Sequence, residues 1–251
     1  MHYGLNNRVA IITGATGGIG HALAKEFYSL GTNLVLTGRN IEQLNMLCEN
    51  LTKIKSDAPA PLCVCADLTA IGIEEQIIQR AVEHFGRLDV LINNAALVEG
   101  QMFLKTDDAF LAKMMHTNFT APYTLSRLAL PHMLKNKYGR IICITSIAGY
   151  MGDSGMSAYA ASKGAMASAA KSIATEYGRR GITANCIAPG IVDTPATKKL
   201  PEERRKELKN MIPARRFAQA DEIAYLAAFL ASERAAYING QQIHINGGLV
   251  R

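Results

Sequence analysis

The chain has 251 residues, of which 49% are hydrophobic, enough to bury the core of a single large domain. The net charge is +6, but lysines and arginines are spread along the chain without a basic arm or interleaved aromatic residues, which argues against nucleic-acid binding. No apolar run approaches the roughly 20 residues that span a bilayer, and the first, Val9–Ile12, ends in glycines rather than a cleavage site. We therefore expect a cytoplasmic protein without a membrane segment.

Short apolar runs alternate with longer helical patterns along the whole chain. The expected strands are Val9–Thr13, Leu34–Thr37, Leu62–Ala66, Val90–Asn93, Ile141–Thr145, Ile182–Ala188 and Gln242–Ile245. The expected helices are Ile19–Leu30, Ile41–Ile54, Ile73–Phe85, Asp107–Lys137, Ser157–Arg179 and Asp221–Ala231. The strand runs are apolar throughout, as in parallel strands covered on both faces. This alternation, without any linker-like segment, predicts one Rossmann-type α/β domain over residues 1–251: a doubly wound parallel sheet of about seven strands with helices on both faces.

The first strand leads directly into a glycine-rich turn, and a helix follows at once. Glycines let the backbone approach a pyrophosphate closely, and the helix N-terminus offers free N–H groups. A plain glycine turn is the alternative, but the order of strand, turn and helix favours a dinucleotide site. The expected cofactor contacts in this turn are Gly14, Thr16, Gly17, Gly18, Ile19 and Gly20.

The end of the second strand bears on the choice of cofactor. An NAD site has an acidic residue near this point to bind the ribose 2′-hydroxyl, whereas this chain has Arg39 and no acid. An arginine can pair with a 2′-phosphate, although an exposed surface arginine is also common. The missing acid favours NADPH/NADP+ as the cofactor.

Two later strand ends carry further expected cofactor residues. Asp67 and Leu68 follow the third strand, where the Asp67 carboxylate can accept a hydrogen bond from the adenine amino group. Asn94 and Ala95 follow the fourth strand. Ligands of open α/β sheets bind at the carboxyl ends of strands, although polar residues at these points also suit ordinary turns.

Three residues suggest the chemistry. Ser146 follows the fifth strand, and Tyr159 and Lys163 stand four residues apart on one face of an expected helix. A free phenol titrates near ~10, and a neighbouring ammonium favours the phenolate, so we expect Lys163 to lower the pKa of Tyr159. Ser146 can orient a substrate carbonyl by a hydrogen bond. The three therefore predict a carbonyl oxidoreductase in which Tyr159 exchanges the proton.

In these residues and their spacing, the chain resembles the short-chain dehydrogenase/reductase family over essentially its whole length. The resemblance rests on Thr13–Gly20, Asp67, Asn93-Asn94-Ala95, Asn118, Ser146, Tyr159, Lys163 and Pro189-Gly190. It implies that Asn118 interrupts its helix and holds a water in a proton relay to Lys163, although the local pattern alone marks Asn118 as an ordinary helical residue. It also implies that Lys163 binds the nicotinamide ribose. One departure is Ala96, where the family usually has glycine.

The resemblance also implies where the nicotinamide lies. The segment after the sixth strand would hold this end of the cofactor through Pro189, Gly190, Ile191 and Thr194, the last two at the carboxamide. The following residues, 193–213, are polar and helix-forming, and they resemble a mobile substrate lid. A fixed surface helix is the alternative.

Within the family, the likeness is greatest to 3-oxoacyl-acyl-carrier-protein reductases. An acidic carrier needs a basic docking patch, yet the two positions where similar reductases have arginines hold Pro131 and Thr175 here. Other cations lie close in sequence: Arg127, Lys135, Lys137, Lys171, Arg179 and Arg180. The expected substrate is a 3-oxoacyl thioester on a carrier protein or coenzyme A. The alternatives are a small free ketone, alcohol or ketosugar, and a non-catalytic NADPH-binding regulator.

Small residues crowd the helix that bears Tyr159, and the resemblance implies that this helix builds a homodimer or homotetramer interface. The five cysteines match no zinc or disulfide framework, so we expect buried, reduced thiols. The histidines His84, His116, His132 and His244 lack metal-ligand spacing, and we expect no metal.

Overall fold

A twisted parallel sheet forms the centre of the computed structural model, which describes residues 3–55 and 58–250. The strand order is β3-β2-β1-β4-β5-β6-β9. The strands are β1 (Val9–Ile12), β2 (Asn33–Gly38), β3 (Leu62–Cys65), β4 (Val90–Asn93), β5 (Gly139–Ile144), β6 (Ile182–Pro189) and β9 (Gln242–Ile245). The order reverses direction between β1 and β4, so a crevice opens at their carboxyl ends, where such sheets bind ligands.

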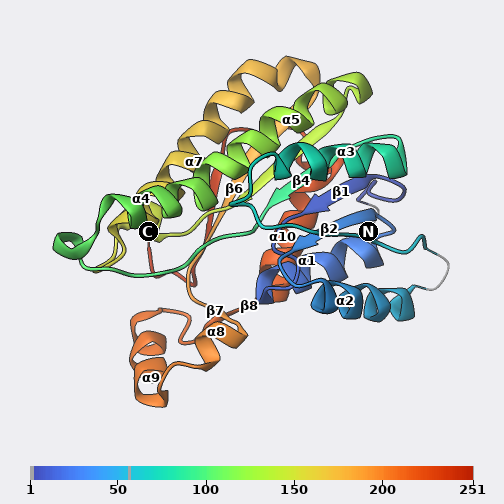
Figure 1. The fold of residues 1–251 in the computed structure, drawn as a ribbon. Helices are drawn as coiled ribbons and strands as arrows, with labels where there is room; N and C mark the ends of the chain where they lie inside the picture. The colour runs from blue at the N-terminus through green and yellow to red at the C-terminus, as the bar shows by residue number, and fades with distance from the viewer. Residues whose placement is uncertain (1–2, 56–57, 251) are drawn as a thin grey trace.

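Helices cover both faces of this sheet (Figure 1). One face packs against α1 (Gly18–Ser29), α2 (Ile41–Ile54) and α10 (Ala220–Ala231). The other packs against α3 (Ile73–Phe85), α5 (Ala121–Asn136) and α7 (Ser157–Tyr177), with α4 (Asp108–Met115) preceding α5. The predicted doubly wound α/β fold is therefore confirmed. Because both faces are covered, the strand residues of β1, β4, β5 and β6 are all buried.

The structure divides some expected elements and adds others. The expected helix Asp107–Lys137 is two helices separated by a π-helical turn at His116–Thr120. A short α6 (Ala148–Met151) follows β5 and was not predicted.

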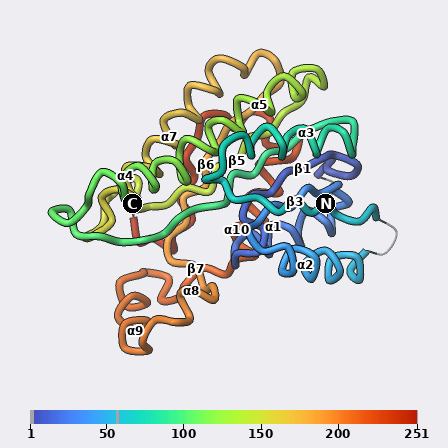
Figure 2. Tube along the Cα trace, in the orientation of Figure 1, coloured from blue at the N-terminus to red at the C-terminus, as the bar shows by residue number. Residues whose placement is uncertain are grey.

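The segment beyond β6 forms a small unit of its own beside the carboxyl end of the sheet. It contains α8 (Pro195–Lys198) and α9 (Glu202–Met211), flanked by the paired short strands β7 (Val192–Asp193) and β8 (Ala218–Gln219). These helices project from the main body, as the Cα tube in Figure 2 shows. None of the helices in the described residues combines the length and the hydrophobicity of a membrane span.

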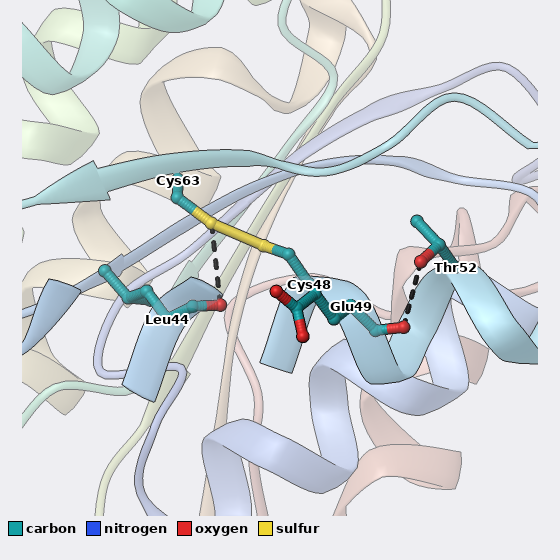
Figure 3. The surroundings of a disulfide bond; sticks show 5 residues. All are labelled: Leu44, Cys48, Glu49, Thr52 and Cys63. Atoms are coloured by element: carbon teal, nitrogen blue, oxygen red, sulfur yellow. Dashed lines mark hydrogen bonds between the residues drawn. A yellow bond between two sulfur atoms is a disulfide. The ribbon is translucent and has the colours of Figure 1, made fainter. Parts of the chain in front are cut away.

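The expectation of reduced cysteines was wrong for one pair. Cys48 on α2 and Cys63 on β3 form a disulfide (Figure 3), whereas Cys65, Cys143 and Cys186 are free. The sequence spacing matched no disulfide framework because the pairing arises from tertiary packing. α2 lies against β2 and β3, which brings together two residues that are 15 positions apart.

Gly20, in the first turn of α1, provides a test of how closely the backbone packs at the glycine-rich turn. A Cβ atom at this position would overlap the Gly14 carbonyl oxygen and lie 2.8 Å from Ala15 Cα. Alanine would otherwise favour the helix by about 1 kcal/mol, but the contacts are to backbone, which cannot move aside cheaply. We expect Gly20→Ala to lower the free energy of unfolding by about 1–3 kcal/mol in urea titrations.

Gly17→Ala is the matched control, since a Cβ atom there lies 3.4 Å from the same Gly14 oxygen and approaches no other backbone group within 4 Å. Equal stability of the two variants would contradict this account of the turn.

Candidate active site

The glycine-rich turn joins β1 to α1 and leaves backbone donors free. Gly17 is the N-cap residue of α1, and no side chain caps the helix. Gly14 has a φ of +63°, and a Cβ atom there would lie 2.8 Å from Ala95 Cα on the neighbouring strand end. The turn therefore presents unpaired N–H groups at a helix N-terminus with glycine where bulk is excluded, which fits the pyrophosphate of a dinucleotide.

Hydrogen bonds lock this turn to the end of β4. Thr13 Oγ1 accepts the backbone N–H groups of Asn94 and Ala95, both at 3.0 Å. The Asn94 side-chain amide donates to the carbonyl oxygens of Thr13 at 2.9 Å and Gly14 at 3.1 Å. The expected cofactor residues Asn94 and Ala95 thus stabilise the conformation of the turn. Their partner is Thr13, for which the sequence predicted no separate role.

The ends of β2 and β3 bring two further predicted residues together. Arg39 is exposed after β2, and Asp67 follows β3. The hydrogen bond from the Thr69 backbone N–H has the largest lowering effect on the pKa of Asp67, followed by the hydrogen bond from the Thr69 hydroxyl. The positive charge of Arg39 adds to this effect. The side chain of Leu68 is buried in the core, so the predicted contact of this residue with the cofactor would be made by its backbone. Only its backbone faces a polar neighbour, the His116 ring 3.0 Å from its carbonyl oxygen.

Tyr159 and Lys163 lie one turn apart on α7, above the carboxyl end of β5. The Lys163 Nζ atom is 5.8 Å from the centre of the Tyr159 ring and donates to the Ile144 carbonyl oxygen at 2.8 Å. Ser146 follows two residues after Ile144, and an interaction with its hydroxyl acts to lower the pKa of Tyr159. The structure therefore brings the three predicted catalytic residues together.

Burial shifts both titratable groups of this set towards their neutral forms. It raises the pKa of Tyr159 above its usual value, against a smaller opposite effect of the Ser146 hydrogen bond. It lowers the pKa of Lys163 to about 8. The expectation that Lys163 lowers the pKa of Tyr159 is not met here, because desolvation of the buried phenol outweighs the effect of its neighbours.

Asn118 connects this set to the rest of the fold. It lies in the π-helical turn between α4 and α5, as the family resemblance implied, and is 2% exposed. Its amide pairs with both backbone groups of Leu97, accepting from the N–H at 2.8 Å and donating to the carbonyl at 2.9 Å. It also donates to Ser162 Oγ at 3.2 Å, and that hydroxyl donates to the Tyr159 carbonyl at 2.7 Å. Ser162 thus connects Asn118 to the backbone of Tyr159. Its sequence context, a run of small residues, does not distinguish it from its neighbours.

Two of the expected nicotinamide residues, Pro189 and Gly190, lie beside the end of β9. The Gly190 N–H donates to the Ile245 carbonyl at 2.9 Å, and the Pro189 carbonyl accepts the Ile147 N–H at 3.1 Å. Further on, Thr194 caps α8, and a Cβ atom on Gly18 would lie 2.8 Å from the Thr194 methyl group. Thr194 thus lies next to the first turn of α1, while the Ile191 carbonyl accepts the N–H of Ala218 on β8 at 2.9 Å.

Comparisons with known proteins show which family the chain is similar to. Residues 14–250 match a family model described as enoyl-(acyl carrier protein) reductase. Nodulation protein G of Rhizobium sp. (strain N33) is 37% identical over 245 residues, 98% of each chain. The 3-oxoacyl-[acyl-carrier-protein] reductases of Rickettsia conorii and Pseudomonas aeruginosa are 35% and 34% identical, again over 98% of each chain.

The lowered pKa of Lys163 predicts a change of stability with pH. Between about pH 8 and the unfolded value near ~10.4, the unfolded chain binds more protons at this group, so stability rises with pH. Relative to Lys163→Met, we expect the free energy of unfolding of the wild type to increase by about 1–2 kcal/mol between pH 8 and 9.5.

Urea titrations of both proteins at several pH values measure this difference. Subtracting the variant removes the contributions of other groups that titrate in the same range. A difference that stays constant, or that falls as the pH rises, would show that the Lys163 ammonium is not desolvated in the folded protein.

Proposed function

The chain belongs to the short-chain dehydrogenase/reductase family of oxidoreductases, and on this premise we propose that it reduces 3-oxoacyl thioesters to 3-hydroxyacyl thioesters with NADPH. The observation that carries the proposal is the convergence of Ser146, Tyr159 and Lys163 beside a turn that fits a dinucleotide. The cofactor, when bound, supplies the hydride. The names of relatives that refer to 3-oxoacyl reduction support the choice of substrate.

Each catalytic residue has a role that its position supports. The Ser146 hydroxyl is placed to hold the substrate carbonyl oxygen beside Tyr159, whose phenol donates the proton to that oxygen. Lys163 is proposed to bind the nicotinamide ribose hydroxyls through Nζ protons and to help return a proton to Tyr159. Asn118 holds the surrounding backbone through Leu97 and Ser162, and the relay water next to it remains a proposal.

We propose a docking site for the carrier of the acyl group from the exposed charges on the outer faces of α5 and α7. Pro131 and Thr175 are exposed and carry no charge, and the Thr175 hydroxyl is bonded to the Lys171 carbonyl at 2.9 Å. Exposed cations stand one helical turn earlier in each case, Arg127 before Pro131 and Lys171 before Thr175. Since both helices begin at the catalytic end of the sheet, these cations lie about 6 Å closer to it. We therefore propose a shifted basic patch that receives an acidic carrier.

Residues 193–213 are proposed to act as a lid over the substrate. No residue of α9 is buried, and an ion pair between Arg205 and Asp193, with N–O distance 3.5 Å, holds the helix to β7. The Arg205 guanidinium also lies 5.9 Å from the centre of the buried Phe217 ring. A segment with few buried contacts opens locally at a low free-energy cost, which suits a lid better than a fixed helix.

The proposal also covers the oligomeric state of the protein and its location in the cell. Exposed or half-buried small residues along α7 (Ala161, Ala165 and Ser168) permit close approach of a second copy, and we propose a homodimer or homotetramer through this helix. A cytoplasmic location follows from the same family premise.

The substrate assignment is tested by comparing kcat/KM for acetoacetyl-carrier protein and acetoacetyl-coenzyme A at low and high salt. A docking patch predicts a preference for the carrier protein that salt weakens. The double variant Arg127→Glu, Lys171→Glu should lose this preference, whereas the matched control Lys135→Glu should keep most of it. Tyr159→Phe should reduce kcat by about 10²–10⁴-fold on either thioester while NADPH binding persists.

Two outcomes of the same assay would overturn the assignment. One is turnover of a simple ketone or ketosugar without turnover of either 3-oxoacyl thioester. The other is reduction of a crotonyl thioester, the reaction named by the matching family model, in preference to the acetoacetyl form.

Cofactor choice is tested at Arg39. The exposed guanidinium and the missing acid predict a higher kcat/KM with NADPH than with NADH, because a 2′-phosphate gains a charge-assisted pair. Arg39→Asp should narrow or reverse this preference, by about tenfold or more in the ratio. Equal use of the two cofactors by the wild type would contradict the assignment.

A further inference from the structure

The disulfide between Cys48 and Cys63 lies at the outer edge of the sheet, on the side of the expected adenosine site. Cys63 belongs to the edge strand β3, and Cys48 belongs to α2, which begins two residues after Arg39 (Figure 3). Both cysteines are half-buried, so reagents in solution can reach the pair. Neither sulfur takes part in the proposed reaction, which leaves the bridge without an assigned role.

The surroundings of the bridge accommodate the reduced state as well. The Cys63 sulfur lies 3.6 Å from the carbonyl oxygen of Leu44, one helical turn before Cys48 (Figure 3). After reduction, the Cys63 thiol can donate its proton to that oxygen. The Leu44 carbonyl oxygen can therefore serve as a partner for Cys63 in the reduced state.

Direct contacts connect the bridge to Arg39. In the sheet, Cys63 is paired with Leu36, and Cys65 is paired with Gly38, the residue before Arg39. The free Cys65 thiol lies 3.6 Å from the Arg39 carbonyl oxygen. The Leu44 side chain reaches 3.6 Å from the position of a Cβ on Gly38. The first turn of α2 and the end of β3 thus both pack against the backbone that carries Arg39.

We propose that Cys48 and Cys63 form a reversible redox-modification site that regulates binding of the cofactor 2′-phosphate. The oxidant is a low-molecular-weight disulfide: two protein thiols and one RSSR give the protein disulfide and two RSH, with two electrons passing to the reagent. A bridge between α2 and β3 holds the Arg39 segment in place, so less conformational freedom is lost when the phosphate binds. The coupling rests on the proposed placement of the 2′-phosphate at Arg39, whereas the bridge itself does not.

The first experiment counts thiols. The protein is equilibrated with oxidised or reduced glutathione, trapped with iodoacetamide and analysed by mass spectrometry after digestion. The proposal expects Cys48 and Cys63 to escape alkylation in the oxidised sample and to be alkylated in the reduced one. Cys65→Ser is the matched control, since it removes a thiol from the same strand and should leave this pattern unchanged. Failure of the pair to bridge at any glutathione ratio would overturn the proposal.

The second experiment measures Kd for NADPH and NADH in both states. We expect reduction to weaken NADPH binding about fivefold and NADH binding less than twofold, because only NADPH has the 2′-phosphate. In Cys48→Ser and Cys63→Ser, the Kd for NADPH should equal the reduced wild-type value under all conditions. The same Kd in both wild-type states would overturn the regulatory role. Loss of NADPH preference in both states would overturn the proposed cofactor and its coupling, while the alkylation pattern still decides whether the bridge forms.

Discussion

The buried side-chain amide of Asn118 ties the segment after β4 to the helix that carries the proposed catalytic residue Tyr159. It pairs with both backbone groups of Leu97, which follows β4, and with the Ser162 hydroxyl, which in turn binds the carbonyl of Tyr159. An amide left unpaired in such surroundings costs about 1–3 kcal/mol. The helix accommodates it by a π-helical turn, which adds a residue to the regular spacing and often occurs at functional sites. Three chain segments are thereby held in register by one side chain.

The parts of the fold that follow from local pattern could be predicted from the sequence. The helices Ile41–Ile54 and Ile73–Phe85 and the strands Val90–Asn93 and Gln242–Ile245 have the predicted limits, because the helical periodicity and the short runs with isoleucine, leucine or valine are encoded within each segment. The glycine turn was also readable from its place between a strand and a helix. In the candidate site, the spacing from Ser146 to Tyr159 and Lys163 was sufficient to place the three together.

The features that the local pattern missed depend on contacts between distant segments. The residues around Asn118 have a continuous helical pattern, so nothing in them marks the π-helical turn without the family resemblance. The partners that require the turn, Leu97 and Ser162, are 21 and 44 residues away. The Cys48–Cys63 disulfide likewise depends on how α2 packs beside β3. The direction of the Tyr159 pKa shift depends on burial, which helical spacing does not reveal.

Burial determines the protonation states of the two titratable groups in the candidate site. Burial raises the pKa of Tyr159, so the phenol keeps its proton at neutral pH, and this is the form that donates to a carbonyl oxygen. Lys163, with a pKa of about 8, is mostly an ammonium at pH 7, and its protein partner is a carbonyl rather than a carboxylate. Its charge is therefore not neutralised by a fixed ion pair and is available to negative charge that develops on Tyr159 as the proton leaves.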